Sequence, residues 1–227
     1  MKEIFNEKAK QAIKETLRLN EALSAQQKQF NFNVDLLSGD NFQNHLELYQ
    51  GYIKNFNEVS AKLDTADRTN VNCNHSEFRS LKLDETFNMN GVYLHELYFA
   101  NIGDPNSEIK MDSLSYMRLS RDFGSFDNWQ KDFMACMAAS QCGWAITYLN
   151  TYTQTFMNAV VDLHANNVPA GSFPVIVLDA WQHAYYRDYL KDVDTYTRAM
   201  MKTLKWPIIE QRIKKADKII QILRGSE

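Results

Sequence analysis

The hydrophobic pattern of the chain changes from a helical to a strand-like period near its middle. The first half favours helices over about residues 39–63 and 84–101, separated by a polar connector. The second half predicts a helix at 126–139, followed by three short strands at about 144–148, 156–163 and 173–178. The second half is therefore an α/β arrangement that follows a helical part.

The first thirty residues form a charged segment in which Phe5, Ala9, Ile13 and Leu17 recur at roughly helical spacing. This spacing predicts a helix packed on the body of the protein, and an oligomerisation or docking arm is the alternative. A turn-rich stretch at 103–112 is the best candidate for a boundary further along the chain. We therefore divide the chain into an arm at 1–30, a helical lobe at 31–110 and an α/β lobe at 111–227.

The most informative stretch is 175–189, where an apolar run ends abruptly at a carboxylate. The run predicts a short buried strand, and the residues after it suit an amphipathic helix. Asp179 therefore lies at the junction, and His183 lies one helical turn further on. A carboxylate and a neutral imidazole together suit iron, manganese or zinc better than calcium or magnesium. An N-cap aspartate followed by an ordinary helix histidine is the simpler explanation of the same pair.

The neighbouring residues extend this pattern. Residues 179–186 read D-x-W-x-H-A-Y-Y, which resembles the signature of the iron/manganese superoxide dismutases. The string FNMNGVYLHELYF around His95 and the string FGSFDNW at 123–129 resemble further stretches of that family, as does the Gly-Trp pair at 143–144. The resemblance extends from about residue 30 to about residue 216.

The resemblance implies an α+β fold, with an N-terminal helical hairpin lobe followed by an α/β lobe that has a small three-stranded antiparallel sheet. It also implies a homodimer or higher homo-oligomer with one iron or manganese ion per subunit that disproportionates superoxide to dioxygen and hydrogen peroxide. By matching position, the ligands are His45, His95, Asp179 and His183, with a water or hydroxide completing the shell. Imidazole and carboxylate ligands with hydrogen-bonded neighbours are the means by which proteins tune such a redox metal.

The first ligand histidine lies in a segment that resembles the family's first long helix. His45 and Tyr52 are seven residues apart there, one fewer than is usual in the family. Seven residues turn an α-helix by about 700°, nearly two full turns, so an unbroken helix keeps both side chains on one face. We therefore predict a helix without the single-residue bulge that the longer spacing would need.

Other positions acquire roles through the same resemblance. Tyr52 matches the phenol that hydrogen-bonds in the substrate funnel, and Trp144 and Trp181 match apolar walls of the site, with plain core packing as the alternative. The family places a glutamine against the metal-bound solvent, either from the second helix, here Gly91, or from the sheet, here His164. A hydrogen-bonding residue there influences the metal potential. A satisfied polar residue at a strand end is the alternative for His164.

Two positions depart from the family pattern. Gln182 occupies the place of a glutamate that reaches across a twofold interface to a ligand histidine, and Tyr186 is expected to cross the same interface. Tyr49 occupies the place of a histidine in the same gateway network. An amide oxygen can still accept an imidazole N–H, but without charge assistance. A structural or assembly protein with weak or no catalysis is therefore an alternative, and hydrolysis by a zinc-bound hydroxide is another.

Composition sets limits on these hypotheses. With 227 residues, of which 44% are hydrophobic, the chain is long enough for one compact unit or two lobes sharing a core. A net charge of −3 and the lack of a basic tract argue against nucleic acid as a partner. The sequence contains no long apolar stretch or secretory signal, which argues against a membrane. Cys73, Cys136 and Cys142 fit reduced thiols, so we expect a cytoplasmic protein.

Overall fold

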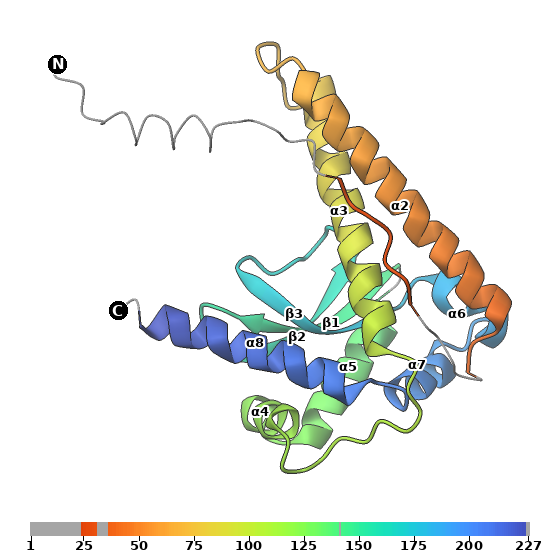
Figure 1. The fold of residues 1–227 in the computed structure, drawn as a ribbon, viewed down its shortest axis with the longest axis vertical. Helices are drawn as coiled ribbons and strands as arrows, with labels where there is room; N and C mark the ends of the chain where they lie inside the picture. The colour runs from red at the N-terminus through yellow and green to blue at the C-terminus, as the bar shows by residue number, and fades with distance from the viewer. Residues whose placement is uncertain (1–23, 31–35, 141, 226–227) are drawn as a thin grey trace.

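The computed structural model describes residues 24–30, 36–140 and 142–225, and Figure 1 shows their arrangement. The helix expected around residues 5–17 lies outside the described residues. The helices are α2 (Gly39–Thr65), α3 (Glu77–Asn101), α4 (Leu114–Phe123), α5 (Phe126–Ala139), α6 (Gln182–Tyr189), α7 (Val193–Met201) and α8 (Trp206–Arg224). The strands are β1 (Gly143–Asn150), β2 (Thr155–Asp162) and β3 (Ser172–Asp179).

The helices α2 and α3 lie side by side as a long hairpin (Figure 1). Serine side chains begin both helices: the Ser38 hydroxyl accepts from Asn41 N, and the Ser76 hydroxyl accepts from Arg79 N. Such caps satisfy backbone N–H groups that have no partner inside the helix. The second helix therefore begins at Glu77, and the expected start near residue 84 is wrong by about two turns.

The three strands form one antiparallel sheet in the order β2-β1-β3, with β1 in the centre. This confirms the α+β fold with a small three-stranded antiparallel sheet. The register places Trp144 of β1 opposite Asp179 of β3 and opposite Val161 of β2. The carboxylate at the end of β3 is thus fixed beside the start of the central strand.

The chain after β3 is more broken than its sequence suggests. The amphipathic stretch after Asp179 predicts one helix, but α6 ends at Tyr189 because Leu190 adopts a left-handed φ of 51°. The helix α7 then begins after Asp192, whose side chain accepts from Thr195 N. None of the described helices is long and apolar enough to cross a lipid bilayer.

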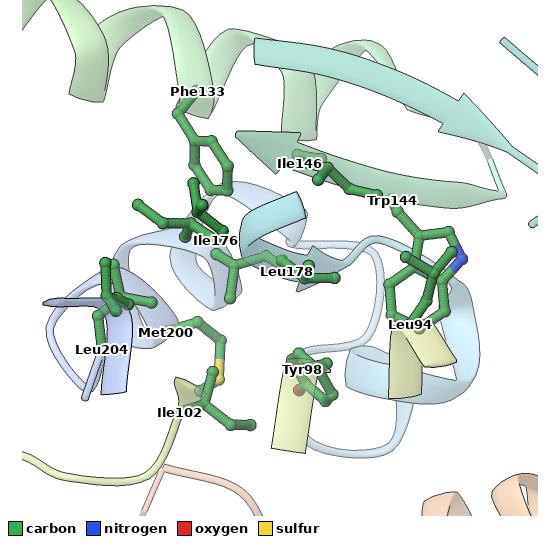
Figure 2. Packing of buried hydrophobic residues seen from close by; sticks show 14 of the residues in the cluster. Leu94, Tyr98, Ile102, Phe133, Trp144, Ile146, Ile176, Leu178, Met200 and Leu204 are labelled. Carbon is green, nitrogen blue, oxygen red and sulfur yellow. The ribbon is translucent and has the colours of Figure 1, made fainter. Parts of the chain in front are cut away.

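The larger of two hydrophobic clusters among the described residues joins the hairpin to the sheet and to the C-terminal helices. Figure 2 shows Leu94 and Tyr98 of α3, and Ile102 directly after its end, facing Ile176 and Leu178 of β3. Each such aliphatic side chain contributes roughly 1.5–3 kcal/mol when fully buried. We keep the two lobes at 31–110 and 111–227 as a proposed division, with the core shared between them.

Candidate metal centre

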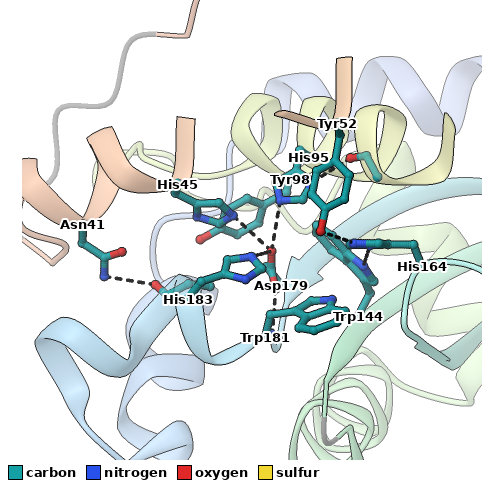
Figure 3. Close-up of polar contacts among 12 residues, drawn as sticks. Asn41, His45, Tyr52, His95, Tyr98, Trp144, His164, Asp179, Trp181 and His183 are labelled. Atoms are coloured by element: carbon teal, nitrogen blue, oxygen red, sulfur yellow. Dashed lines mark hydrogen bonds and ion pairs between the residues drawn. The ribbon is translucent and has the colours of Figure 1, made fainter. Parts of the chain in front are cut away.

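Three imidazoles and one carboxylate meet where the hairpin covers the end of the sheet (Figure 3). One nitrogen or oxygen from each residue lies within 4.8 Å of the others, from His45, His95, Asp179 and His183. Asp179 Oδ2 is 3.2 Å from His45 Nε2, 3.3 Å from His183 Nε2 and 3.8 Å from His95 Nε2. The four side chains come from α2, α3, β3 and α6, so the tertiary fold builds the cluster.

The helix α2 runs without interruption and directs two of the predicted site residues toward α3. The ring of His45 lies 5.0 Å from that of His95, and the ring of Tyr52 lies 5.2 Å from that of His95. The seven-residue spacing is therefore accommodated by a regular helix with no bulge. His45 faces His95 and Asp179, as the proposed ligand set requires.

The two oxygens of Asp179 have different partners. Oδ1 accepts from the backbone N–H of Trp181 at 2.7 Å, while Oδ2 faces the three histidines. Burial would raise the pKa of Asp179, but the neighbouring His183 and His45 hold it below its usual value. The Asp179 carboxylate can therefore accept from the backbone N–H of Trp181 and still offer an oxygen to a metal ion, because each interaction uses a different oxygen.

The buried imidazoles of His45 and His95 are neutral. Burial lowers the pKa of His45, and burial together with the nearby His45 lowers the pKa of His95 further. The Nδ1 atom of His95 is 2.6 Å from the carbonyl oxygen of Gly91, which can only accept, so Nδ1 carries the proton. The lone pair of Nε2 then faces the cluster, as a metal ligand requires.

The Nε2 atom of His95 is buried without a hydrogen-bond partner among the described residues. It also points its lone pair at the Asp179 carboxylate, which carries a negative charge. A cation between these two electron-rich atoms would satisfy both of them. The residues therefore fit a bound metal ion, and the imidazole and carboxylate donors suit iron, manganese or zinc.

A second layer of hydrogen bonds fixes the protonation of His164. The indole Nε1–H of Trp144 donates to His164 Nδ1 at 2.8 Å, and an indole N–H can only donate. Because burial lowers the pKa of His164 to about 4, the ring is neutral and its proton lies on Nε2. That N–H therefore donates to Tyr52 Oη at 2.9 Å, and the Tyr52 hydroxyl proton remains available to a further acceptor.

The backbone at His164 departs from ordinary strand geometry. Leu163 has a φ of 59° and His164 a φ of 112°, values that residues other than glycine seldom adopt. The Asn90 amide on α3 donates to the carbonyl oxygen of His164 at 2.9 Å and holds the turn against the hairpin.

The helix α3 approaches Tyr52 closely at Gly91. An added Cβ at Gly91 would lie 2.7 Å from Tyr52 Cδ1, so no larger residue fits there unless Tyr52 moves.

The two predicted aromatic walls contact the cluster directly. The indole of Trp144 is buried with its ring 4.9 Å from His95 at 84°, and Trp181 stacks on His183 at 5.7 Å and 20°. Trp181 also stacks on His164 at 5.2 Å and 30°. The two indoles thus pack against the rings of His95 and His183 and restrict their orientation.

The three positions expected near a subunit interface differ in their surroundings. Gln182 is exposed at the start of α6, and Tyr186 is 52% exposed one turn later. Tyr49 is fully buried: its hydroxyl donates to Glu96 Oε1 at 2.9 Å and accepts from the backbone N–H of Lys28 at 3.2 Å. In the described chain, Tyr49 is therefore tied to α3 and to the segment before α2.

The sequence analysis missed the polar contacts that join α2 to α6. The Asn41 amide donates to Asp188 Oδ2 at 2.8 Å and to the carbonyl oxygen of Ala184 at 3.2 Å. The backbone N–H of Ser38 also donates to Asp188 at 2.9 Å. The Ser-x-x-Asn start of α2 was a usable signal for a helix N-cap. It gave no indication of the partner of the Asn41 side chain, because Asp188 lies 147 residues away.

Comparison with known proteins gives consistent matches. The family described as iron/manganese superoxide dismutases, C-terminal domain, matches residues 113–212. An iron superoxide dismutase of Aquifex aeolicus is 34% identical over 201 residues, covering 85% of this chain and 91% of that protein. A manganese superoxide dismutase of Halobacterium salinarum is 29% identical over 168 residues, covering 74% and 82%. An iron superoxide dismutase of Cupriavidus metallidurans is 30% identical over 167 residues, covering 73% and 82%.

Proposed function

Because the chain belongs to the iron/manganese superoxide dismutase family, we propose that it disproportionates superoxide to dioxygen and hydrogen peroxide. In this proposal, one iron or manganese ion per subunit is held by the four clustered side chains, namely His45, His95, Asp179 and His183. The observation that carries the proposal is their convergence within 4.8 Å, with a buried and unpartnered Nε2 on His95. When bound, the ion supplies the redox chemistry, since it accepts an electron from one superoxide and returns it to the next.

The surrounding residues support this chemistry through charge and shape. Asp179 contributes one buried negative charge, and the neutral imidazoles of His45 and His95 contribute none. The ligand set therefore neutralises only part of the charge of a divalent or trivalent cation. The site keeps a net positive charge, which favours an anionic substrate such as superoxide.

We propose that Tyr52 delivers protons, which the formation of hydrogen peroxide consumes. Burial raises the pKa of Tyr52 to about 12, so its hydroxyl keeps its proton at neutral pH. His164 donates to the Tyr52 oxygen, which leaves the phenolic O–H free to donate toward the site. Tyr52 also lines a surface depression formed by one face of α2, together with Asn44, Glu47, Leu48, Gly51 and Asn55. We propose that Tyr52 connects this depression with the buried His164.

The test combines metal analysis of the purified chain with superoxide-decay assays on iron-loaded and manganese-loaded samples. We expect about one ion per chain and accelerated decay, both abolished in His95→Ala. The matched control is His75→Ala, because His75 is exposed outside the cluster and its loss should change neither quantity. Bound metal without activity would favour the structural or assembly alternative. No bound metal under any loading would refute the ligand assignment.

We also propose that the protein is a homodimer and that it works in the cytoplasm. Gln182 and Tyr186 are exposed on α6 beside the cluster, where a second copy could reach them. The three free thiols suit a reducing compartment. Sedimentation velocity of the wild-type chain and of Tyr186→Ala tests the dimer: a monomeric wild type would refute it, and a weakened dimer in the variant would support the α6 contact.

A further inference from the structure

Two polar side chains, Asn101 and Arg212, lie within the apolar core. Asn101 is the last residue of α3 and is fully buried, and Arg212 lies on α8 with 8% exposure. Their helices contact each other, and both contact β3. Among the described strands, β3 is an edge of the sheet, so alternate backbone groups along it have no neighbouring strand.

The Asn101 amide takes the place of that missing strand at one residue. Its Oδ1 accepts from Val177 N at 2.9 Å, and its Nδ2 donates to the carbonyl oxygen of Val177 at 2.9 Å. Nδ2 also donates to the carbonyl oxygen of Tyr98 at 3.2 Å. Both backbone groups of one β3 residue are thereby bonded to the end of α3, which fixes the helix along the strand direction.

Arg212 completes the arrangement from α8. Its Nη1 donates to Asn101 Oδ1 at 3.0 Å and to the carbonyl oxygen of Val175 at 3.1 Å, and its Nη2 donates to the carbonyl oxygen of Leu97 at 2.9 Å. All these acceptors are neutral, and burial lowers the pKa of Arg212 to about 10. A buried charge of this kind is often no more stabilising than an apolar side chain of similar volume. A contribution to folding stability therefore does not by itself explain why Arg212 is buried here.

The position of Asn101 and Arg212 relative to the metal centre suggests a role for their hydrogen bonds. Asn101 follows His95 by six residues on α3, and Val177 precedes Asp179 by two residues on β3. His95 and Asp179 are both fully buried, with Nε2 and Oδ2 3.8 Å apart. A slip of one helical residue would move His95 by about 1.5 Å and rotate it by about 100°. A fixed contact between α3 and β3 prevents such a slip.

We propose that Asn101 and Arg212 are positioning residues that set the alignment of His95 with Asp179 and thereby the retention and coordination geometry of the metal. This inference rests on the proposed function, since it assumes that His95 and Asp179 are ligands. Neither Asn101 nor Arg212 touches the cluster itself. Their effect is transmitted through the backbone of α3 and β3.

The test compares Arg212→Met with Glu210→Gln in the full-length, iron-loaded protein. Glu210 is a matched control because it also lies on α8 and also bonds to backbone, accepting from Leu114 N at 3.3 Å and Ser115 N at 2.8 Å on α4. We measure iron release to a chelator, the electron paramagnetic resonance spectrum of the ferric protein, and the melting temperature of the metal-free protein. Arg212→Met should release iron about 10-fold faster or more and change the ferric spectrum. Glu210→Gln should lower the melting temperature and leave both metal readouts unchanged.

Two further variants keep the test decisive if Arg212→Met does not fold. Arg212→Lys keeps the charge but not the forked geometry, and Asn101→Asp keeps the acceptor for Val177 N but loses the donated bonds. Both should release iron faster than Glu210→Gln does. If the wild type retains metal and these variants show the same ferric spectrum and iron release rate as the wild type, this inference is wrong while the proposed function stands. A wild type that binds neither iron nor manganese would instead overturn the proposed function and this inference with it.

Discussion

Acidification of the metal-free protein should destabilise it through His164 in particular. His164 is fully buried, and its Nδ1 accepts from Trp144, so protonation at this nitrogen breaks that hydrogen bond. The other ring nitrogen already donates to Tyr52. Burial accordingly lowers the pKa of His164 to about 4 in the folded chain, whereas an unfolded histidine has a pKa near 6.5.

The sign and the magnitude of the pH effect on the free energy of unfolding follow from these two pKa values of His164. The unfolded chain binds more protons than the folded chain below pH 6.5, so stability is complete above that value and declines as the pH falls toward 4. Since one pKa unit corresponds to about 1.4 kcal/mol, the difference predicts a loss of about 2 kcal/mol between pH 7.5 and pH 5. His45 and His95, whose pKa values are also lowered, add to the loss in the same direction.

Urea unfolding at pH 7.5 and pH 5 measures this contribution when the wild type is compared with His164→Gln. Glutamine can accept from Trp144 through its oxygen and donate to Tyr52 through its NH₂ group, but it does not titrate. We expect the free energy of unfolding to fall by about 2 kcal/mol more in the wild type than in this variant. His75→Ala serves as the control and should follow the wild type. Equal losses in the wild type and His164→Gln would refute the assigned hydrogen bonds.

Three further substitutions give separate predictions. Gly91→Ala places a methyl group 2.7 Å from Tyr52 Cδ1, so Tyr52 must move; superoxide decay should slow while metal content stays unchanged. Gln182→Glu should tighten the dimer or slow metal release, measured by sedimentation equilibrium and a chelator, whereas equal behaviour would show that the amide suffices. Cys73→Ala removes an exposed thiol and should leave activity intact and stability within about 0.5 kcal/mol; a larger loss in thermal unfolding would contradict this.

Local sequence signals predicted the regular elements where each element carried its own pattern. The helix α5 was predicted at its observed bounds, and its start follows Ser125, whose hydroxyl accepts from Asn128 N. The break after α6 was not predictable in this way, because Leu190 has no intrinsic preference for a left-handed φ. The helix α8 was missed although buried residues recur along it at helical spacing, as at Ile209, Ile213, Ala216 and Ile220.

The candidate site was predictable to the extent that its residues lie in short recognisable strings. The contacts that hold those residues in place were not, because they join distant parts of the chain. Asn101 and Val177 are 76 residues apart, and Asn101 and Arg212 are 111 apart. Neither a period nor a spacing rule relates such positions. Only the packing of α3, β3 and α8 brings them together.

A glutamine at position 164 would preserve the direction of the hydrogen bonds that His164 makes. A glutamine at this position offers one acceptor and one donor group, and neutral His164 offers the same pair when its proton is on Nε2. The indole of Trp144 enforces that tautomer, because it can only donate to Nδ1. The hydroxyl of Tyr52 therefore receives a hydrogen bond in either case. The difference is that a histidine can gain a proton, so this chain acquires a pH dependence at a position where an amide would have none.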